Sequence, residues 1–442
     1  MDFSSQSQGI MSRMFKWLDR PAVIAMFRLA SAGLSLVTAP IVARTLGPAG
    51  RGQTATIVSI LLIAPIMLGA GVPIVVRRRA LTSEGAAKVT RVARVISPLC
   101  LLPALLIAII ALHTVLGDLP TYARVLFLVA AAFGMPATIQ YNCDSNVLFA
   151  QGRNLEFAFS AMLPVLVQTV LVIFGAFVNI ISVGYFTCAI LAGNIISLAY
   201  TSWRIKIPFR GERDGIIATL KDGTKFGGAQ FADAASRRLD QVIAIPIVGA
   251  TQAGFYSVAA SISLITMALG QAVAAVAFRR VSAANDTGND QEAIVVESGK
   301  VIRETLVLTA LVAILLVATT PTLVPLMFGV EFQPAIAPTI VALLGSVGVV
   351  LGFVGSSMLS ALDKGWAMTT AQVSGLVIGI ALAFFMGSRY LAIGLAAASS
   401  IGYWIAAIWC LTALPVKLRH LAPRFIDLTG AVRSLVTVTE AT

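Results

Sequence analysis

The most constraining feature of this sequence is a series of apolar segments, each about as long as a helix that crosses a lipid bilayer. A transmembrane helix needs about 20 mostly apolar residues. Twelve such segments cover residues 22–43, 54–76, 95–116, 123–149, 157–179, 181–203, 226–248, 254–278, 305–328, 334–361, 366–387 and 391–414. The sequence therefore predicts an all-α polytopic membrane protein with about 12 transmembrane helices.

The composition excludes the main alternative classes of protein. Hydrophobic residues make up 58% of the chain and charged residues 12%, and the mean hydropathy is +0.90. A soluble protein of this size needs more polar residues to cover its surface. The net charge of +12 would suggest nucleic-acid binding in a soluble protein. In a membrane protein it indicates topology instead, so no nucleic-acid partner is expected.

The positions of Lys and Arg predict the orientation in the membrane. Twenty-five of them lie at the two ends of the chain and in alternate loops, and only four lie in the other loops: Arg44, Arg51, Arg124 and Arg389. Because the side richer in Lys and Arg is normally cytoplasmic, both termini are expected in the cytoplasm. We interpret Arg77-Arg78-Arg79 and the loop 204–225 as topogenic segments that face anionic lipid.

The order of spans and loops predicts two domains of similar size. A cytoplasmic N-terminal segment, 1–21, precedes an N-terminal six-helix bundle, 22–203. A cytoplasmic linker, 204–225, leads to a C-terminal six-helix bundle, 226–414, and a cytoplasmic tail, 415–442.

The two halves also resemble each other in sequence. Residues 41–63 align with 243–265 at a shift of 202, and a second match at a shift of 211 follows spans 4 and 10. The first alignment pairs Gly47 with Gly249 and Gly52 with Gly254. With six spans in each half, this repeat is parallel, and transporters with such halves usually bind substrate between them near the midplane. Chance similarity of Gly-rich and Ile-rich helices is the alternative.

Ionisable residues within the predicted spans suggest a water-filled cavity between the halves. They are Arg28, Asp144, Asp233, Arg237, Arg238 and Asp240. Each costs at least about 2.5 kcal/mol at the bilayer centre, so each should face water or an opposite charge. The arginines would make the cavity positive and suited to phosphate, which guanidinium groups bind through two hydrogen bonds. The residues predicted to bind substrate are Arg28, Arg237, Arg238, Asp240 and Gln230.

The acidic residues leave two interpretations open. Asp144, Asp233 and the neighbouring Asn142 are expected to be polar cavity groups or the site of a coupling ion, H⁺ or Na⁺. Asp233, Arg237 and Asp240 follow the spacing i, i+4, i+7 and share one helical stripe. They are equally compatible with a self-neutralising ladder that only orders this helix.

Motifs of the common membrane and soluble enzymes are absent from the sequence. It contains no GxxxxGK[ST] phosphate loop, no HExxH and no GxSxG. Its two histidines, His113 and His420, are isolated, so no metal site is expected. We therefore expect no enzymatic activity, no catalytic residues and no cofactor apart from a coupling ion.

Several stretches together resemble a known family. They are ARTLGPAGRGQTA (43–55), RRLDQVIAIPIVGATQAGFYSVA (237–259), LMFGVEFQPAIAP (326–338) and MLSALDK (358–364). Their order resembles that in the polysaccharide-unit (O-antigen type) flippases of the multidrug/oligosaccharidyl-lipid/polysaccharide exporter superfamily, over essentially the whole chain. The resemblance implies two six-helix bundles in a V shape around a central cavity.

The same resemblance implies a function. Such flippases carry a polyprenyl-diphosphate-linked oligosaccharide, a polysaccharide repeat unit, across the bacterial inner membrane by alternating access. Membrane lipids and this lipid-linked glycan would be partners, with a polysaccharide polymerase or glycosyltransferases nearby. Arg28 matches a cavity arginine of the family, and Asp240 matches the Asp of its helix-7 motif. A cation-coupled small-molecule or multidrug efflux antiporter of the same superfamily is the alternative.

Overall fold

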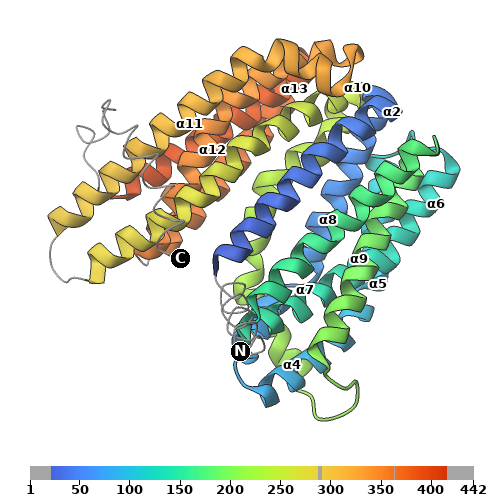
Figure 1. Cartoon of the computed structure of the whole chain (residues 1–442), viewed down its shortest axis with the longest axis vertical. Helices are drawn as coiled ribbons and strands as arrows, with labels where there is room; N and C mark the ends of the chain where they lie inside the picture. The colour runs from blue at the N-terminus through green and yellow to red at the C-terminus, as the bar shows by residue number, and fades with distance from the viewer. Residues whose placement is uncertain (1–20, 287–290, 363, 416–442) are drawn as a thin grey trace, which may run out of the picture. The chain divides into compact units, whose positions relative to one another are not determined.

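The computed structural model describes residues 21–286, 291–362 and 364–415, which form helices and no strand. In hydrocarbon every backbone amide must be satisfied within its own segment, which favours helices for long apolar runs. The first half contains α2 (Pro21–Leu68), α3 (Val72–Arg79), α4 (Ser83–Leu99), α5 (Leu101–Thr114), α6 (Thr121–Val129), the π-helix η1 (Ala130–Gly134), α7 (Met135–Ala150), α8 (Asn154–Phe177) and α9 (Val183–Ile205). The second contains α10 (Ile216–Asp286), α11 (Gln291–Phe328), the 3₁₀ helix η2 (Val330–Ala335), α12 (Ile336–Ala361) and α13 (Gly365–Ala413) (Figure 1).

The described helices account for the twelve expected spans. Eight helical stretches are long and apolar enough to cross a membrane, and the pair α4–α5, bent by 40°, adds a ninth. Three of these stretches contain a backbone break, at Gly47 in α2, Gly249 in α10 and Leu391 in α13. Each piece on either side of a break exceeds the roughly 20 residues that one span needs. The three broken stretches therefore supply two spans each, and the nine described stretches together supply twelve. The chain is therefore a multi-pass, all-α membrane protein.

The described residues group into two compact units. Unit 1 contains the residues up to Thr38 together with Ile60–Phe231, and unit 2 contains Ala39–Ser59 together with the residues from Ala232 onwards. The middle of α2 thus packs with the second half of the chain. The predicted cytoplasmic segments 1–21 and 415–442 lie outside the described residues, except for residues 21 and 415 themselves.

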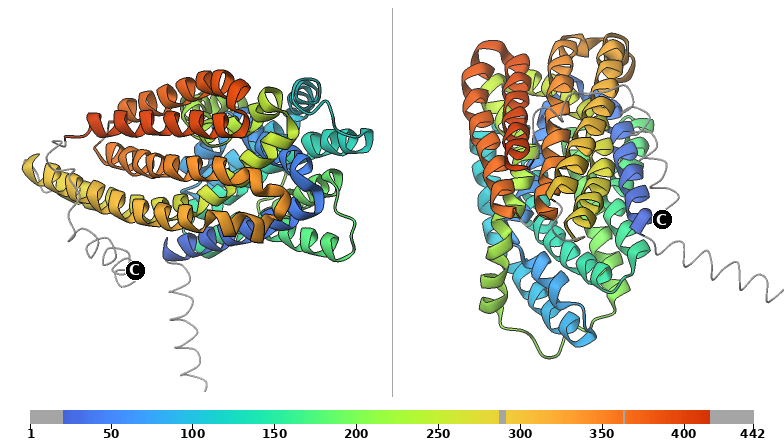
Figure 2. Two further views of the ribbon diagram at one scale, coloured as in Figure 1. Left: turned by 90° about the horizontal axis from the view of Figure 1, so that it is seen from above. Right: turned by 90° about the vertical axis from the view of Figure 1, so that its left-hand side faces the viewer.

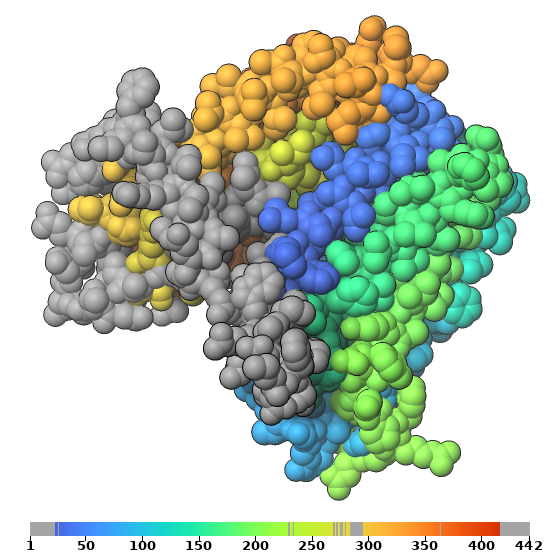
Figure 3. Space-filling view, viewed as in Figure 1, coloured from blue at the N-terminus to red at the C-terminus, as the bar shows by residue number. Residues whose placement is uncertain are grey.

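In unit 1, α2 packs beside α8. The hydroxyls of Thr38 and Thr169 form a hydrogen bond of 2.9 Å between these helices. In the space-filling view the blue surface of α2 adjoins the green surface of α8 (Figure 3). One threonine donates to the other, and the second donates to the carbonyl oxygen four residues earlier in its own helix, so neither hydroxyl is unsatisfied in this apolar interface.

The third span begins earlier than the predicted residue 95. The helix α4 starts at Ser83 because the Thr82 hydroxyl accepts the amide hydrogen of Gly85 and caps the first turn. Lys88, Arg91 and Arg94, which the sequence places in a loop, therefore lie on this helix. The hydropathy pattern does not predict this start, because the partly buried basic residues lower the average over the window.

The segment between α9 and α10, residues 206–215, is bound to α3 and α4 by cationic side chains. Arg79 pairs with Asp214 at 3.0 Å and with Asp222 at 2.6 Å. Arg91 donates to the carbonyl oxygens of Pro208 and Glu212. Hydrogen bonds from Lys225 and Arg79 hold the pKa of Asp222 below its ordinary value.

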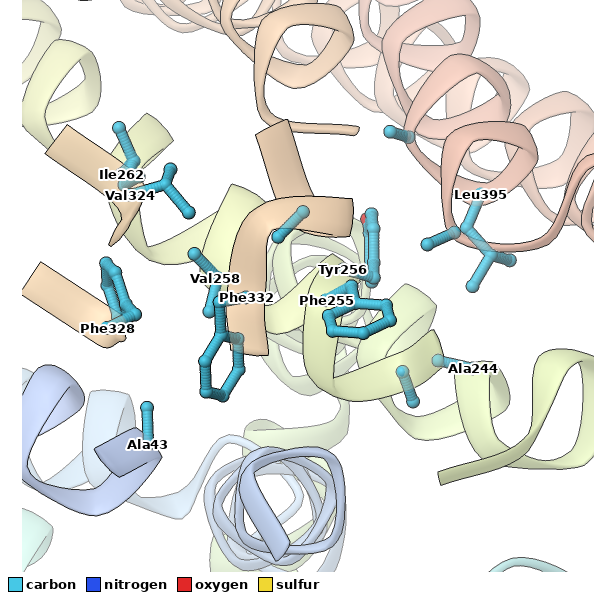
Figure 4. Packing of buried hydrophobic residues seen from close by; sticks show 14 of the residues in the cluster. Ala43, Ala244, Phe255, Tyr256, Val258, Ile262, Val324, Phe328, Phe332 and Leu395 are labelled. Atoms are coloured by element: carbon cyan, nitrogen blue, oxygen red, sulfur yellow. The ribbon is translucent and has the colours of Figure 1, made fainter. Parts of the chain in front are cut away.

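Unit 2 is built around the helices α11, α12 and α13, which lie side by side (Figures 1 and 2). A cluster of buried apolar residues joins them to α10, and it includes Phe255, Phe328 and Phe332 (Figure 4). The ring centroids of Phe255 and Phe332 are 6.1 Å apart in an edge-to-face arrangement, a geometry that aromatic pairs favour. This packing fixes the part of α10 that carries the candidate site.

A reciprocal crossing within unit 2 matches the internal repeat. A Cβ atom on Gly52 would lie 2.1 Å from the carbonyl oxygen of Ala250, and one on Gly254 would lie 1.9 Å from that of Pro48. The four residues are two pairs related by the shift of 202. The breaks just before them, at Gly47 (φ 66°) and Gly249 (φ 80°), have similar dihedral angles that favour glycine.

We expect Gly52→Ala to destabilise the protein by about 1–3 kcal/mol, because its methyl group would force apart two backbones that now touch. Gly33→Ala is the matched control, since no atom lies within 4 Å of the added carbon, and alanine favours a helix by up to about 1 kcal/mol. Thermal unfolding in detergent measures both. An unchanged melting temperature for Gly52→Ala would contradict the close crossing.

Candidate functional site

The candidate site lies in unit 2, around Asp240 on α10. The Tyr256 hydroxyl donates a hydrogen bond to one carboxylate oxygen of Asp240. Ser399 and Tyr403 of α13 place their hydroxyl oxygens 3.4 Å from the same oxygen. The backbone amide of Gln241 donates to the other oxygen at 2.8 Å. The carboxylate is therefore held in one orientation between α10 and α13.

A pocket opens beside this carboxylate. It has an empty volume of about 430 Å³, which includes space open to solvent, and residues of α10 and α13 line it. Its polar side chains are Ser236, Asp240, Gln372, Ser399 and Tyr403, and small or aliphatic residues form the rest. Small residues allow the two pieces of α13, before and after its break at Leu391, to approach each other: a Cβ atom on Gly375 would lie 2.6 Å from the Gly402 carbonyl oxygen.

Three arginines of unit 2 lie near one another, and one of them, Arg238, also lies near Asp240. Arg238 interacts electrostatically with Asp240, Arg237 and Arg51. The Arg237 guanidinium lies 5.0 Å from the centroid of the Phe353 ring, which stabilises the cation through its π face. Guanidinium groups that lie near one another suit an anion with several oxygens.

Arg51 is the functional candidate that the sequence analysis missed. Its predicted place was a loop, but it lies in the helical piece after Gly47 and is only 9% exposed. One terminal nitrogen donates to the Ser261 hydroxyl at 2.7 Å, while its buried Nε has no hydrogen-bond partner among the described residues. The Gly47-Pro48 pair could have predicted that a helix begins before Arg51, because proline is favoured in the first turn of a helix.

The predicted site residues are distributed over both units. Arg237, Arg238 and Asp240 belong to unit 2, as described above. In unit 1 the predicted residues are Arg28, Asn142, Asp144 and Gln230. Arg28 is exposed, and Asn142 and Gln230 are partly buried. The side chain of Asp233 lies outside the described part of the structure.

Asp144 is completely buried and fully hydrogen-bonded. Its two carboxylate oxygens accept hydrogen bonds of 2.7 Å from Gln140 on α7 and from Ser202 on α9. Gln140 in turn accepts a hydrogen bond from Ser97 on α4. This network connects three helices of unit 1, and Arg94 supplies a nearby positive charge.

Among the described residues, no group of three or more His, Cys, Asp or Glu side chains is arranged to hold a metal ion. The candidate site of unit 2 offers guanidinium, hydroxyl, amide and carboxylate groups for hydrogen bonding and electrostatic attraction.

Comparison with known proteins identifies the fold and the family. A family model described as "Polysaccharide biosynthesis protein" matches residues 20–284, which is more than half of the chain. No curated protein sequence matches the chain significantly.

Several solved structures share the fold. One is an inward-facing multidrug resistance transporter of the MATE family and the MOP superfamily, with 15% identity, 95% of this chain and 99% of that chain covered, and a TM-score of 0.71. Another is the lipid II flippase MurJ in an inward closed conformation, with 15% identity, coverage of 95% and 93%, and a TM-score of 0.71. A third is a MOP superfamily transporter from Pyrococcus furiosus, with 16% identity, 96% coverage of both chains and a TM-score of 0.57.

We expect Ser261→Ala to destabilise the protein by about 1–3 kcal/mol, because it removes the hydroxyl that accepts a hydrogen bond from buried Arg51. Ser263→Ala is the control, since that hydroxyl bonds to the Ala259 carbonyl of its own helix. Thermal unfolding in detergent compares the two. Equal melting temperatures would show that Arg51 does not depend on Ser261.

Proposed function

Because the chain belongs to the polysaccharide biosynthesis protein family, we propose that it is a flippase for a polyprenyl-diphosphate-linked oligosaccharide. In this proposal it moves a polysaccharide repeat unit across the bacterial inner membrane by alternating access, with both termini in the cytoplasm. Enzymes that build or polymerise the glycan, such as glycosyltransferases and a polymerase, would supply and consume the substrate. The chain itself catalyses no covalent step.

The observation that carries the proposal is the cationic cluster of unit 2. Arg51 and Arg237 lie near Arg238, Arg238 interacts with Asp240, and Asp240 lines an open pocket. A diphosphate presents several charged oxygens, and guanidinium groups bind such oxygens through paired hydrogen bonds. Asp240 has a supporting role, since its negative charge attracts the Arg238 guanidinium.

The membrane potential would favour outward movement of this headgroup. A diphosphate carries about two negative charges, and each is worth about 2.3 kcal/mol per 100 mV. With a negative cell interior of about 100 mV, outward transfer gains roughly 4–5 kcal/mol. The arginines must then bind the diphosphate strongly enough to replace its hydration, but weakly enough to release it outside.

The alternative, a cation-coupled small-molecule efflux antiporter, needs a carboxylate whose ligands change during transport. Asp240 offers a defined group for such a role, since hydroxyls from α10 and α13 converge on it. In this case H⁺ or Na⁺ would be the coupling ion. Transport of drugs that depends on an ion gradient, without movement of lipid-linked glycan, would favour this function.

We expect Arg238→Gln to slow flipping of the lipid-linked oligosaccharide at least tenfold, because a charge-assisted hydrogen bond is worth about 1.5–3 kcal/mol. The assay uses proteoliposomes and a glycan-modifying enzyme that acts only on the outer leaflet. Lys300→Gln is the control, since it removes the same charge from an exposed site of unit 2. Equal flipping by Arg238→Gln, at equal protein content, would refute the role of the cluster.

A further inference from the structure

The pocket beside Asp240 and the cationic cluster of unit 2 suit different chemical groups. Asp240 is the one charged side chain among the described residues that line the pocket. Because a carboxylate repels phosphate, the pocket is a poor place for the diphosphate that we assign to the arginines. Arg238 nevertheless lies only two residues from Asp240 along α10. An anion-binding group and an acidic pocket are therefore neighbours in this site.

The two oxygens of the Asp240 carboxylate differ in how many hydrogen bonds they already accept. Three hydroxyls approach one oxygen: Tyr256 donates to it, and Ser399 and Tyr403 lie 3.4 Å away. The other oxygen accepts a single hydrogen bond, of 2.8 Å, from the backbone amide of Gln241. A carboxylate oxygen has two lone-pair sites, so this second oxygen can accept a further hydrogen bond from a ligand.

Gln372 on α13 supplies a second free acceptor to the same pocket. Its amide nitrogen donates a hydrogen bond of 3.1 Å to the Ser356 hydroxyl. Within the described ranges, its amide oxygen accepts no hydrogen bond. The bond to Ser356 fixes the orientation of the amide group, so its oxygen remains as an oriented acceptor.

The hydroxyls that line the pocket also act as acceptors, because their hydrogens are used within the protein. Ser236 donates to the carbonyl oxygen of Ala232 at 2.8 Å, and Tyr403 donates to Asp240 at 3.4 Å. Each hydroxyl oxygen keeps lone pairs for another donor. The pocket therefore holds more free acceptors than free donors, and it suits a ligand that carries several O–H groups.

The rest of the lining is apolar and small. Aliphatic side chains and glycines make up much of it: Ile243, Leu376, Ile380, Gly375, Gly379 and Gly402. The empty volume of about 430 Å³ is near the lower end of the range of small-molecule sites, about 300–1,000 Å³. That size suits one sugar ring rather than a whole oligosaccharide. A sugar ring has hydroxyls at its edge and C–H groups on its faces, which matches a lining of both kinds.

We propose that this pocket binds the first sugar of the lipid-linked oligosaccharide, the ring joined directly to the diphosphate. Its hydroxyls donate hydrogen bonds to Asp240, Gln372 and Tyr403. This inference rests on the proposed function and adds a sugar subsite to it. In such a substrate an anionic group is bonded directly to a neutral, hydroxyl-rich group. The neighbouring positions of Arg238 and Asp240 on α10 match that order.

A small cation is the other ligand that free oxygen acceptors suit. The two ligands make different predictions. Sugar binding makes the affinity depend on whether the carrier lipid bears a sugar, whereas cation binding makes it depend on the ion. An experiment that varies the sugar and the ion separately distinguishes them.

The experiment measures binding to the full chain in nanodiscs of neutral lipid. The probes are polyprenyl diphosphate and the same lipid bearing one ring of glucose, galactose or N-acetylglucosamine, each with and without Na⁺. We expect the natural sequence to bind at least one sugar-bearing lipid about tenfold more tightly than the bare lipid. Gln372→Leu and Tyr403→Phe should each reduce this preference by about three- to tenfold. Unchanged affinity for the bare lipid shows that these variants are folded.

The matched controls make the same chemical changes at exposed residues of unit 2. They are Gln333→Leu and Tyr390→Phe, and both should keep the preference for the sugar-bearing lipid. Arg238→Gln should weaken binding of all the lipids equally, because it changes the contact with phosphate and not the contact with the sugar.

Two results would overturn the sugar subsite. One is equal affinity of the natural sequence for the bare lipid and all three sugar-bearing lipids. The other is a preference that survives both Gln372→Leu and Tyr403→Phe. Binding that depends on Na⁺ but not on the sugar would assign the pocket to a cation instead. The proposed function fails separately, if Arg238→Gln flips the substrate normally, whereas flipping without any sugar preference removes only the subsite.

Discussion

The structure depends on how charged side chains are accommodated in helices that hydrocarbon surrounds. An unpaired charge there is costly, so each must find hydrogen bonds, an aromatic face or water. Asp144 meets this requirement through Gln140 and Ser202, and its network joins α4, α7 and α9. The Asp240 carboxylate instead joins α10 to α13 beside an open pocket. The first arrangement is closed and structural, while the second keeps room for a ligand.

The reciprocal glycine crossing gives the internal repeat a physical meaning. Gly52 packs against Ala250 and Gly254 packs against Pro48, so equivalent residues of the two halves meet around a local two-fold relation. Only glycine permits backbones to approach this closely, and hydrocarbon supplies no other strong force between apolar helices. The crossing also explains why residues 39–59, although early in the sequence, pack with unit 2.

Much of the fold could be predicted from the sequence, because span length and turn residues are local properties. The breaks at Gly47, Gly249 and Leu391 occur at or beside the predicted loops, and the resemblance to polysaccharide-unit flippases is confirmed by the family match. The start of α4 and the position of Arg51 were wrong. Both involve charged residues inside helices, where averaged hydropathy predicts a loop although capping and burial favour the helix.

The sequence by itself determined the all-α membrane class, the number of spans and the family, since these follow from composition, periodicity and residue order. It also selected Arg237, Arg238 and Asp240 as candidates because charge within an apolar span is conspicuous. Only the tertiary structure decided their partners. Arg51, Ser399 and Tyr403 come from distant segments, and no local pattern predicts which side chains meet when helices pack. Likewise, only folding brings Arg79 to its partners Asp214 and Asp222, which lie more than 130 residues further along the chain.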